Sequence, residues 1–233
     1  MLDCKDVRSG YGHLPVLHGV DLQVAAGEVV ALLGRNGVGK TTLLKTLVGA
    51  LALRSGKLSL DGQDVSGLAA HRRARAGIAH VPQGRGIFSQ LTVEENLIVG
   101  TRAAGGRARK DVLDDVLSFF PVLRERRGET AGNFSGGQQQ QLAIGRALCG
   151  SPKVLLLDEP SEGIQPNIVH EIGELIPKLA RQYGIAVLLV EQNLDLVAHT
   201  ATRCLFMDKG RIVHAVPVSA LSDENLLKNL LAL

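Results

Sequence analysis

The sequence predicts an α/β fold in which a helical segment interrupts a parallel sheet, and three patterns indicate it. Short apolar runs rich in Val, Ile and Leu are typical of strands buried on both faces of a sheet, and they cover residues 29–33, 153–157 and 185–190. Apolar residues with helical spacing follow at 42–48 and 166–183. Residues 88–150 are helical in pattern with no strand-like run, so they are expected to be an insertion into the α/β core.

Composition fits one self-folding chain and excludes several classes of protein. The 233 residues are 45% hydrophobic, which is enough for a substantial core, and the net charge is only +3. Because aromatic residues make up 3% and Trp is absent, a nucleic-acid-binding surface is not expected. Cys4, Cys149 and Cys204 form no CxxC pair, which fits a reducing cytosol rather than a zinc site or a disulfide framework. We interpret them as small hydrophobic residues.

The sequence shows neither the pattern of a signal peptide nor an apolar run long enough to span a bilayer. The chain is therefore expected to be soluble and intracellular. A role at a membrane would require a partner that supplies the membrane-crossing helices.

At the N-terminus, residues 2–24 alternate loosely between apolar and polar positions. Turn signals at Ser9-Gly10 and Gly12 predict short strands around a glycine-rich bend. Tyr11 lies on that bend.

The strand at 29–33 leads into a glycine-rich loop and then into a helix. The loop matches the pattern G-x-x-x-x-G-K-[ST] and consists of Gly34, Arg35, Asn36, Gly37, Val38, Gly39, Lys40 and Thr41. Its glycines can adopt positive φ and turn successive backbone N–H groups toward one concavity at a helix N-terminus, where the dipole favours anions. A polyphosphate fits there: the Lys40 ammonium would contact the β- and γ-phosphates, and the Thr41 hydroxyl would ligate Mg²⁺.

ATP and Mg²⁺ are therefore expected to bind at residues 34–42, and Thr42 is the last residue of this predicted site. A glycine-rich turn with a surface lysine is the alternative, and it explains the full spacing and its flanks poorly. The ring of Tyr11 precedes this site and could stack on adenine, although a lone Tyr in a turn is more often a packed loop residue.

After the first helix, strands at 56–60 and 63–65 flank Asp61-Gly62, which is a strong hairpin signal. The Arg- and Ala-rich stretch 69–76 has the pattern of a short exposed helix.

Residues 78–81 return to strand, and Gln83 follows at its carboxyl end, where ligands gather in open α/β sheets. By itself this glutamine carries no functional meaning. The helices expected in the insertion cover 93–101, 109–120 and 136–149.

The last helix of the insertion opens with Ser135, Gly136, Gly137 and Gln138. Ser135 is a natural N-cap, and the two glycines leave backbone N–H groups bare, so this is a second candidate anion site. Without the phosphate loop, a flexible capped turn would be the preferred interpretation.

The strand at 153–157 ends in Asp158-Glu159-Pro160. Two carboxylates at the end of a buried strand are costly to desolvate unless a cation or hydrogen-bond donors meet them, and Mg²⁺ is the obvious cation. Asp158 would hold the metal, and Glu159 could orient and deprotonate an attacking water. A helix-capping role fits less well, because the helix at 166–183 begins too far downstream.

The strand at 185–190 has a polar end at Glu191-Gln192-Asn193. A hairpin is then predicted around 208–210, between strands 204–207 and 211–213, and Ser222 is expected to cap a final amphipathic helix that runs to Leu231.

With these stretches in order, the chain resembles the ATP-binding-cassette (ABC) ATPases over essentially its whole length. The phosphate loop at 34–41, SGGQ at 135–138 and LLLDEP at 155–160 carry the resemblance. It implies a P-loop NTPase (RecA-like) core with an antiparallel β subdomain and an inserted helical subdomain that bears the signature SGGQ. The single domain would comprise a core at about 1–86 and 151–233 and a helical subdomain at about 87–150.

The resemblance also implies roles for individual residues. Tyr11 would stack on adenine, Gln83 would be the coupling glutamine near Mg²⁺ and the γ-phosphate, and Glu159 would be the general base. Two cassettes, identical or sister ATPases, would pair head to tail, so that the signature at 135–138 of one completes the nucleotide site of the other. ATP then joins the subunits, and hydrolysis releases them.

Two positions depart from the family pattern. Gln192 stands where most members carry a switch histidine; its amide can donate a hydrogen bond to the γ-phosphate but cannot titrate near neutral pH. Gln165 stands where Asp is usual. Both concern communication between subunits and leave Lys40, Asp158 and Glu159 in place.

The branch of the family is indicated by VEQN at 190–193, which is similar to the ATPases of branched-chain amino acid importers. NFSGGQQQQLAI at 133–144 and DEPSEGIQP at 158–166 look most like the urea-import ATPase subunit. The resemblance thus implies a bacterial urea importer, with branched-chain amino acids or another small amide as the alternative solute.

Partners implied by the resemblance are two membrane-spanning permease subunits, docked near residues 84–95, and indirectly an extracytoplasmic binding protein. The chain would lie in the cytoplasm on the inner face of the membrane. An ATPase acting on nucleic acid would ordinarily show a long heptad insertion or a second cassette, and neither is present. A non-catalytic regulatory module would be expected to lack Lys40 or Glu159, and both are intact.

Overall fold

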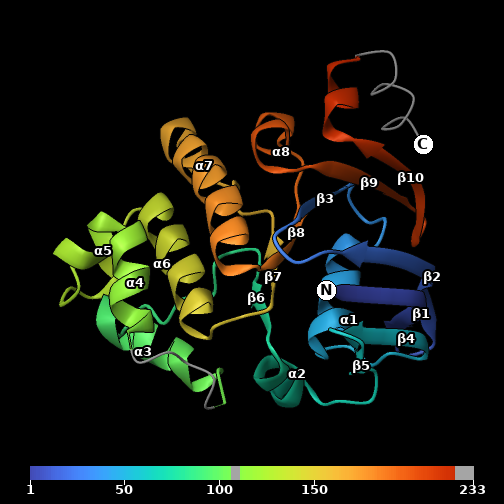
Figure 1. The fold of residues 1–233 in the computed structure, drawn as a ribbon, viewed down its shortest axis with the longest axis horizontal. Helices are drawn as coiled ribbons and strands as arrows, with labels where there is room; N and C mark the ends of the chain where they lie inside the picture. The colour runs from blue at the N-terminus through green and yellow to red at the C-terminus, as the bar shows by residue number, and fades with distance from the viewer. Residues whose placement is uncertain (106–110, 224–233) are drawn as a thin grey trace.

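The computed structural model describes residues 1–105 and 111–223, which form two sheets and the helices around them (Figure 1). The larger sheet has six strands, in the spatial order β10 (Arg211–Pro217), β9 (Arg203–Asp208), β3 (Val29–Leu33), β8 (Ala186–Val190), β7 (Val154–Asp158) and β6 (Ile78–Val81). Every neighbouring pair is parallel except the β9–β10 hairpin. The predicted α/β class is confirmed.

Strands β3, β7 and β8 are buried at every position, as their apolar runs predict. Alternate side chains of β3 enter different cores: Val29 lies in one cluster and Val30 in the other. Because carboxyl ends of parallel strands share one edge, the loops after β3, β7 and β8 are brought together there.

The second sheet is antiparallel, in the order β2 (Leu14–Val24), β1 (Leu2–Tyr11), β4 (Ser55–Leu60) and β5 (Gln63–Asp64). The prediction of short strands within residues 2–24 is wrong, since β1 and β2 have 10 and 11 residues. Register shifts in β1 around Val7 and Ser9 break the alternation, which conceals the true strand length. The predicted turn at Asp61-Gly62 is confirmed, with φ of 49° and 79° at its two residues.

The helices are α1 (Lys40–Val48), α2 (Ala70–Ala76), α3 (Val93–Arg102), α4 (Val112–Phe119), α5 (Pro121–Glu125), α6 (Gly136–Cys149), α7 (Pro166–Tyr183) and α8 (Leu194–Thr200), with 3-10 turns at Ala131–Asn133 and Val218–Ser222. Helix α1 packs Leu43, Leu44 and Leu47 into the core shared by the two sheets. In Figure 1, α3 to α6 stand apart from the antiparallel sheet, on the far side of the larger sheet.

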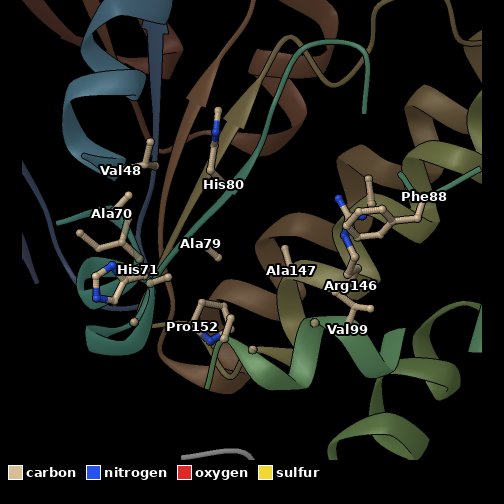
Figure 2. Close-up of a pocket in the computed structure, with 17 residues that line it drawn as sticks. Val48, Ala70, His71, Ala79, His80, Phe88, Val99, Arg146, Ala147 and Pro152 are labelled. Carbon is tan, nitrogen blue, oxygen red and sulfur yellow. The ribbon is translucent and has the colours of Figure 1, made fainter. Parts of the chain in front are cut away.

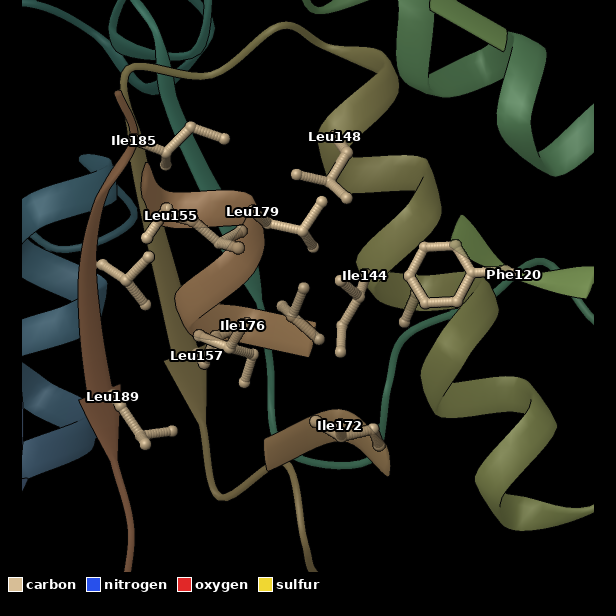
Figure 3. Packing of buried hydrophobic residues seen from close by; sticks show 14 of the residues in the cluster. Phe120, Ile144, Leu148, Leu155, Leu157, Ile172, Ile176, Leu179, Ile185 and Leu189 are labelled. Atoms are coloured by element: carbon tan, nitrogen blue, oxygen red, sulfur yellow. The ribbon is translucent and has the colours of Figure 1, made fainter. Parts of the chain in front are cut away.

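The second core joins these helices to the larger sheet. Figure 3 shows Ile144 and Leu148 of α6 on one side of Ile176 and Leu179 of α7, and Leu155 of β7 on the other. Helix α7 thus lies between the sheet and the inserted helices.

Several predicted elements need correction. The helix expected at 109–120 includes residues outside the described range, and the described part, α4, begins at Val112 and ends at Phe119. Helices α5 and α8 were not predicted, because each is too short for its periodicity to stand out. Ser222 ends the 3-10 turn at 218–222, and residues 224–233 of the predicted final helix lie outside the described residues.

Helix α2 is not fully exposed as predicted, because Arg73 is only 2% exposed. Its guanidinium donates hydrogen bonds to the carbonyl oxygens of Thr46, Leu47, Leu68 and Ser66, at 2.6 to 3.0 Å. The first two carbonyls end α1, whose C-terminal dipole favours a cation. Arg73 therefore fixes the far end of the helix that starts at Lys40.

Candidate nucleotide site

The glycine-rich loop connects β3 to α1, as the sequence predicts. Gly34, Gly37 and Gly39 have φ of 151°, 83° and 114°, so the predicted positive φ values are confirmed. A Cβ on Gly34 would lie 2.4 Å from the Met207 carbonyl oxygen of β9, so only glycine fits there. The β9–β10 turn also holds the loop, since the Gly210 N–H donates to the Val38 carbonyl at 2.8 Å.

Lys40, the first residue of α1, is 5% exposed. Its Nζ donates to the carbonyl oxygens of Gly34 at 2.7 Å and Arg35 at 3.0 Å. Burial lowers the pKa of the ammonium, an effect that the Glu159 and Asp158 carboxylates oppose. The Lys40 ammonium therefore lies against the backbone of the glycine-rich loop and near the carboxylates of Asp158 and Glu159.

A cleft of about 410 Å³ opens beside this loop. It is lined by Asn36, Gly37, Gly39, Lys40, Thr41, Thr42, Gln83, Glu159, Glu162 and Gln192. Loops after β3, β6, β7 and β8 thus converge on one space at the carboxyl edge of the sheet, which is where open α/β sheets bind ligands.

Asp158 lies behind the cleft and is 3% exposed. The Thr41 hydroxyl donates to its Oδ1 at 3.5 Å. Burial raises the pKa of the Asp158 carboxyl, and the Thr41 hydrogen bond opposes the rise. A hydroxyl and a buried carboxylate are oxygen donors that suit Mg²⁺, and a cation there would offset the cost of burying the charge.

Glu159 follows β7 with φ of 48°, which is unusual for a residue other than glycine. Its N–H donates to the Val190 carbonyl at 2.9 Å, which ties the turn to β8. The Gln192 amide donates to Glu159 Oε1 at 2.7 Å and to Asn36 Oδ1 at 3.0 Å. Gln192 therefore links the acidic turn to the phosphate loop.

The sequence analysis predicted no role for two residues near the cleft, Glu162 and Arg85. Glu162 Oε2 accepts a hydrogen bond from Gln83 Nε2 at 2.9 Å. Arg85, with φ of 71°, donates to Gln139 Oε1 at 3.3 Å and to the Gly163 carbonyl at 3.4 Å. These contacts join loops that are far apart in the sequence, so no local pattern could reveal them.

The remaining predicted residues lie outside the cleft lining. Ser135 caps α6 as predicted, in a reciprocal capping box with Gln138. Gly136 is close to the loop after Glu159, since a Cβ on it would lie 3.1 Å from the Gly163 carbonyl. Neither these residues nor Gly137 line the cleft of their own chain.

Tyr11 also lies outside the cleft lining and is 46% exposed at the end of β1. The turn that follows it is held by Arg54, whose Nη2 donates to the Gly12 carbonyl at 2.5 Å. The strand that pairs with Tyr11 contributes Leu17, which a Cβ on Gly39 would approach to 3.3 Å. The hairpin thus packs against the phosphate loop and leaves the ring exposed.

Comparisons with known proteins agree with this geometry. A family model described as ABC transporter matches residues 17–162. The high-affinity branched-chain amino acid transport ATP-binding protein BraG of Pseudomonas aeruginosa is 46% identical over 213 residues, 91% of each chain. The probable branched-chain amino acid transport ATP-binding protein LivF of Archaeoglobus fulgidus is 36% identical over 91% of this chain and 90% of its own.

Relatives with other tasks are similar as well. The lipopolysaccharide export system ATP-binding protein LptB of Escherichia coli K12 is 34% identical over 97% of this chain and 94% of its own. Among solved structures, the ADP conformation of MJ1267, an ATP-binding cassette of an ABC transporter, has a TM-score of 0.84 with 27% identity and covers 98% of this chain and 97% of its own.

No helix within residues 1–105 and 111–223 combines the length and apolar character that crossing a membrane requires. The family match, the similarity to transport ATP-binding proteins and the cassette fold together show that this chain belongs to the ABC transporter family, as one of its ATP-hydrolysing cassettes.

Proposed function

We propose that this cassette powers a solute importer and that it hydrolyses ATP in the cleft between the phosphate loop and Glu159. The observation that carries the proposal is the contact of Gln192 with both Glu159 and Asn36, which places a carboxylate at the open side of the phosphate loop. A non-catalytic nucleotide-binding module would not need a carboxylate there.

In the proposed mechanism, Lys40 exchanges its bonds to the Gly34 and Arg35 carbonyls for phosphate oxygens of ATP. The bare N–H groups of the loop add further donors to the phosphates. Glu159 orients a water and accepts its proton, and Gln192 holds that carboxylate in place from one side.

Asp158 and Thr41, with Gln83 nearby in the cleft, would hold Mg²⁺, which offsets phosphate charge and acts as a Lewis acid when bound. Among the residues that the structure describes, no three His, Cys, Asp or Glu side chains group so as to hold a metal by themselves. Phosphate oxygens of ATP and water would complete the ligand set, which is the usual arrangement for Mg²⁺.

A second cassette, identical or a sister chain, would supply Ser135 to Gln138 to this cleft, and Tyr11 would receive the adenine. The support is that the capped start of α6 carries bare N–H groups yet lines no part of its own chain's cleft. The exposed ring of Tyr11 is available for stacking.

A groove suited to a membrane-embedded partner lies elsewhere, between α2, β6, α3 and α6. It measures about 450 Å³ and is mostly apolar (Figure 2). Phe88 and Val99 form one side, with the Arg146 guanidinium 4.9 Å from the Phe88 ring, and Ala70 and His71 form the other. Of the expected docking stretch 84–95, only Phe88 lines it.

We propose that a cytoplasmic helix of each permease subunit docks in this groove, which would hold the cassette on the inner face of the membrane. V99E should abolish transport and the stimulation of ATPase activity by solute, because docking would have to remove the introduced charge from water. Ile98 is equally exposed, at 42% against 40%, but does not line the groove, so I98E is the control. Equal loss in both variants, or none in either, would refute the docking site.

The solute is proposed from relatives. BraG and LivF favour branched-chain amino acids, while the motifs at 133–144 and 158–166 favour urea as the second candidate. The experiment is ATPase activity in membranes that contain the whole complex and its binding protein, with leucine, urea or neither. Stimulation by leucine supports amino acid import, and stimulation by urea supports the interpretation of the two motifs. If neither solute stimulates an active complex, both are rejected.

A further inference from the structure

Glu191 is a buried acidic residue to which neither the family motifs nor the cleft assigns a task. It follows β8 directly and is 2% exposed. Three backbone N–H groups donate to its carboxylate: Ser161 to Oε1 at 2.9 Å, and Gln192 and Asn193 to Oε2 at 2.8 and 2.9 Å. Such hydrogen bonds offset the cost of burying a carboxyl group away from water.

The two oxygens serve different loops. Ser161 belongs to the turn that begins at Glu159, whereas Gln192 and Asn193 form the loop that leads into α8. Since β8 pairs with both β3 and β7, a side chain at its carboxyl end lies between the phosphate loop and the acidic turn. Glu191 is placed to join them.

The geometry of the catalytic pair depends on both loops. Glu159 is in a backbone conformation with φ of 48°, which persists only where surrounding contacts enforce it. The Gln192 side chain reaches Glu159 Oε1 from a backbone whose N–H is bound to Glu191. A shift of either loop would separate the two side chains.

We infer that Glu191 is a positioning residue for ATP hydrolysis, which clamps the Glu159 turn and the Gln192 loop in the relation that catalysis needs. The inference rests on the proposed roles of Glu159 and Gln192. Glu191 itself touches no substrate, so its effect is expected on turnover rather than on ATP binding.

The test uses E191Q, which keeps the shape of the side chain but has only one accepting atom. Its NH₂ group would face the N–H donors of one loop, and that loop would be released. We expect kcat to fall about 10- to 100-fold with little change in KM for ATP, by analogy with the loss of activity when a residue that orients a metal ligand is replaced. Rates are expressed per titrated nucleotide site, so that loss of folded protein does not count as loss of activity.

E191D separates clamping from the kind of group, because it keeps a carboxyl group but is one methylene too short to reach both loops. We expect it to be impaired like E191Q, whereas recovery of kcat would show that only the carboxyl group matters and would overturn the inference. E174Q, which changes an exposed glutamate of α7 paired with Lys178, should behave as wild type.

A double variant tests whether Glu191 acts through Gln192. If it does, the kcat of E191Q/Q192A is no lower than that of the more impaired single variant. If the two residues act independently, the two fold-losses in kcat multiply. Multiplying effects, an unchanged kcat in E191Q, or a rise in KM without a fall in kcat would each refute the inference. A wild-type chain that does not hydrolyse ATP would instead refute the proposed function.

Discussion

Replacing Glu159 with Gln is expected to lower ATP turnover about 10²- to 10⁴-fold, because the variant cannot accept a proton from the attacking water. ATP binding should remain, since the phosphate loop and Asp158 are untouched. The variant should therefore accumulate as an ATP-bound dimer, which single-turnover kinetics and size-exclusion chromatography with ATP would detect.

E162Q is the matched control, because Glu162 lines the same cleft but contacts Gln83 rather than Gln192. We expect a far smaller loss of turnover in that variant. Equal losses would mean that the cleft requires its negative charge in general, and wild-type turnover in E159Q would remove Glu159 from the mechanism.

Replacing Lys40 with Met is expected to weaken ATP binding about 10- to 100-fold, since a hydrogen bond to a charged group contributes about 1.5–3 kcal/mol. Methionine keeps the apolar stem, so the buried position beside Gly34 stays filled. Nucleotide affinity is measured by equilibrium titration with ATP and, separately, with AMP. Because AMP lacks the β- and γ-phosphates, its affinity should be nearly the same for K40M and the wild type.

Lys45 provides the comparison, because it lies on the same helix but is exposed in its last turn. K45M should bind ATP as the wild type does. A similar loss of affinity in K45M would attribute the effect to helix charge rather than to contact with phosphate, and parallel losses for ATP and AMP in K40M would contradict the β- and γ-phosphate assignment.

Local patterns predicted most of the fold because they report what each segment must bury. The runs at 29–33 and 185–190 became central strands since their side chains are apolar on both faces. Irregular segments were harder. The bulges of β1 and the brevity of α8 erase the periodicity on which such predictions depend.

The parts of the candidate site differ in how far the sequence alone could predict them. The phosphate loop could be recognised within one short stretch, because its glycines, lysine and threonine act as neighbours in sequence. The role of Gln83 came only from family resemblance, whereas for Tyr11 and Ser135 the residues left a structural alternative that only the resemblance weighed against. All three functional roles remain predictions, because residue spacing says nothing about what these side chains touch.

By itself, the sequence determined the α/β class, the phosphate loop and the acidic end of β7, since each depends on residues that are adjacent along the chain. Only the tertiary structure decided that Gln192 meets Glu159, that Glu162 holds Gln83 and that Glu191 joins two loops. Apart from the bonds of Glu191 to its own neighbours, the residues in these contacts are 30 or more positions apart in the sequence. They meet because the order of strands in the sheet places separate loops at one edge. Strand order is a property of packing, which no local stretch of the sequence encodes.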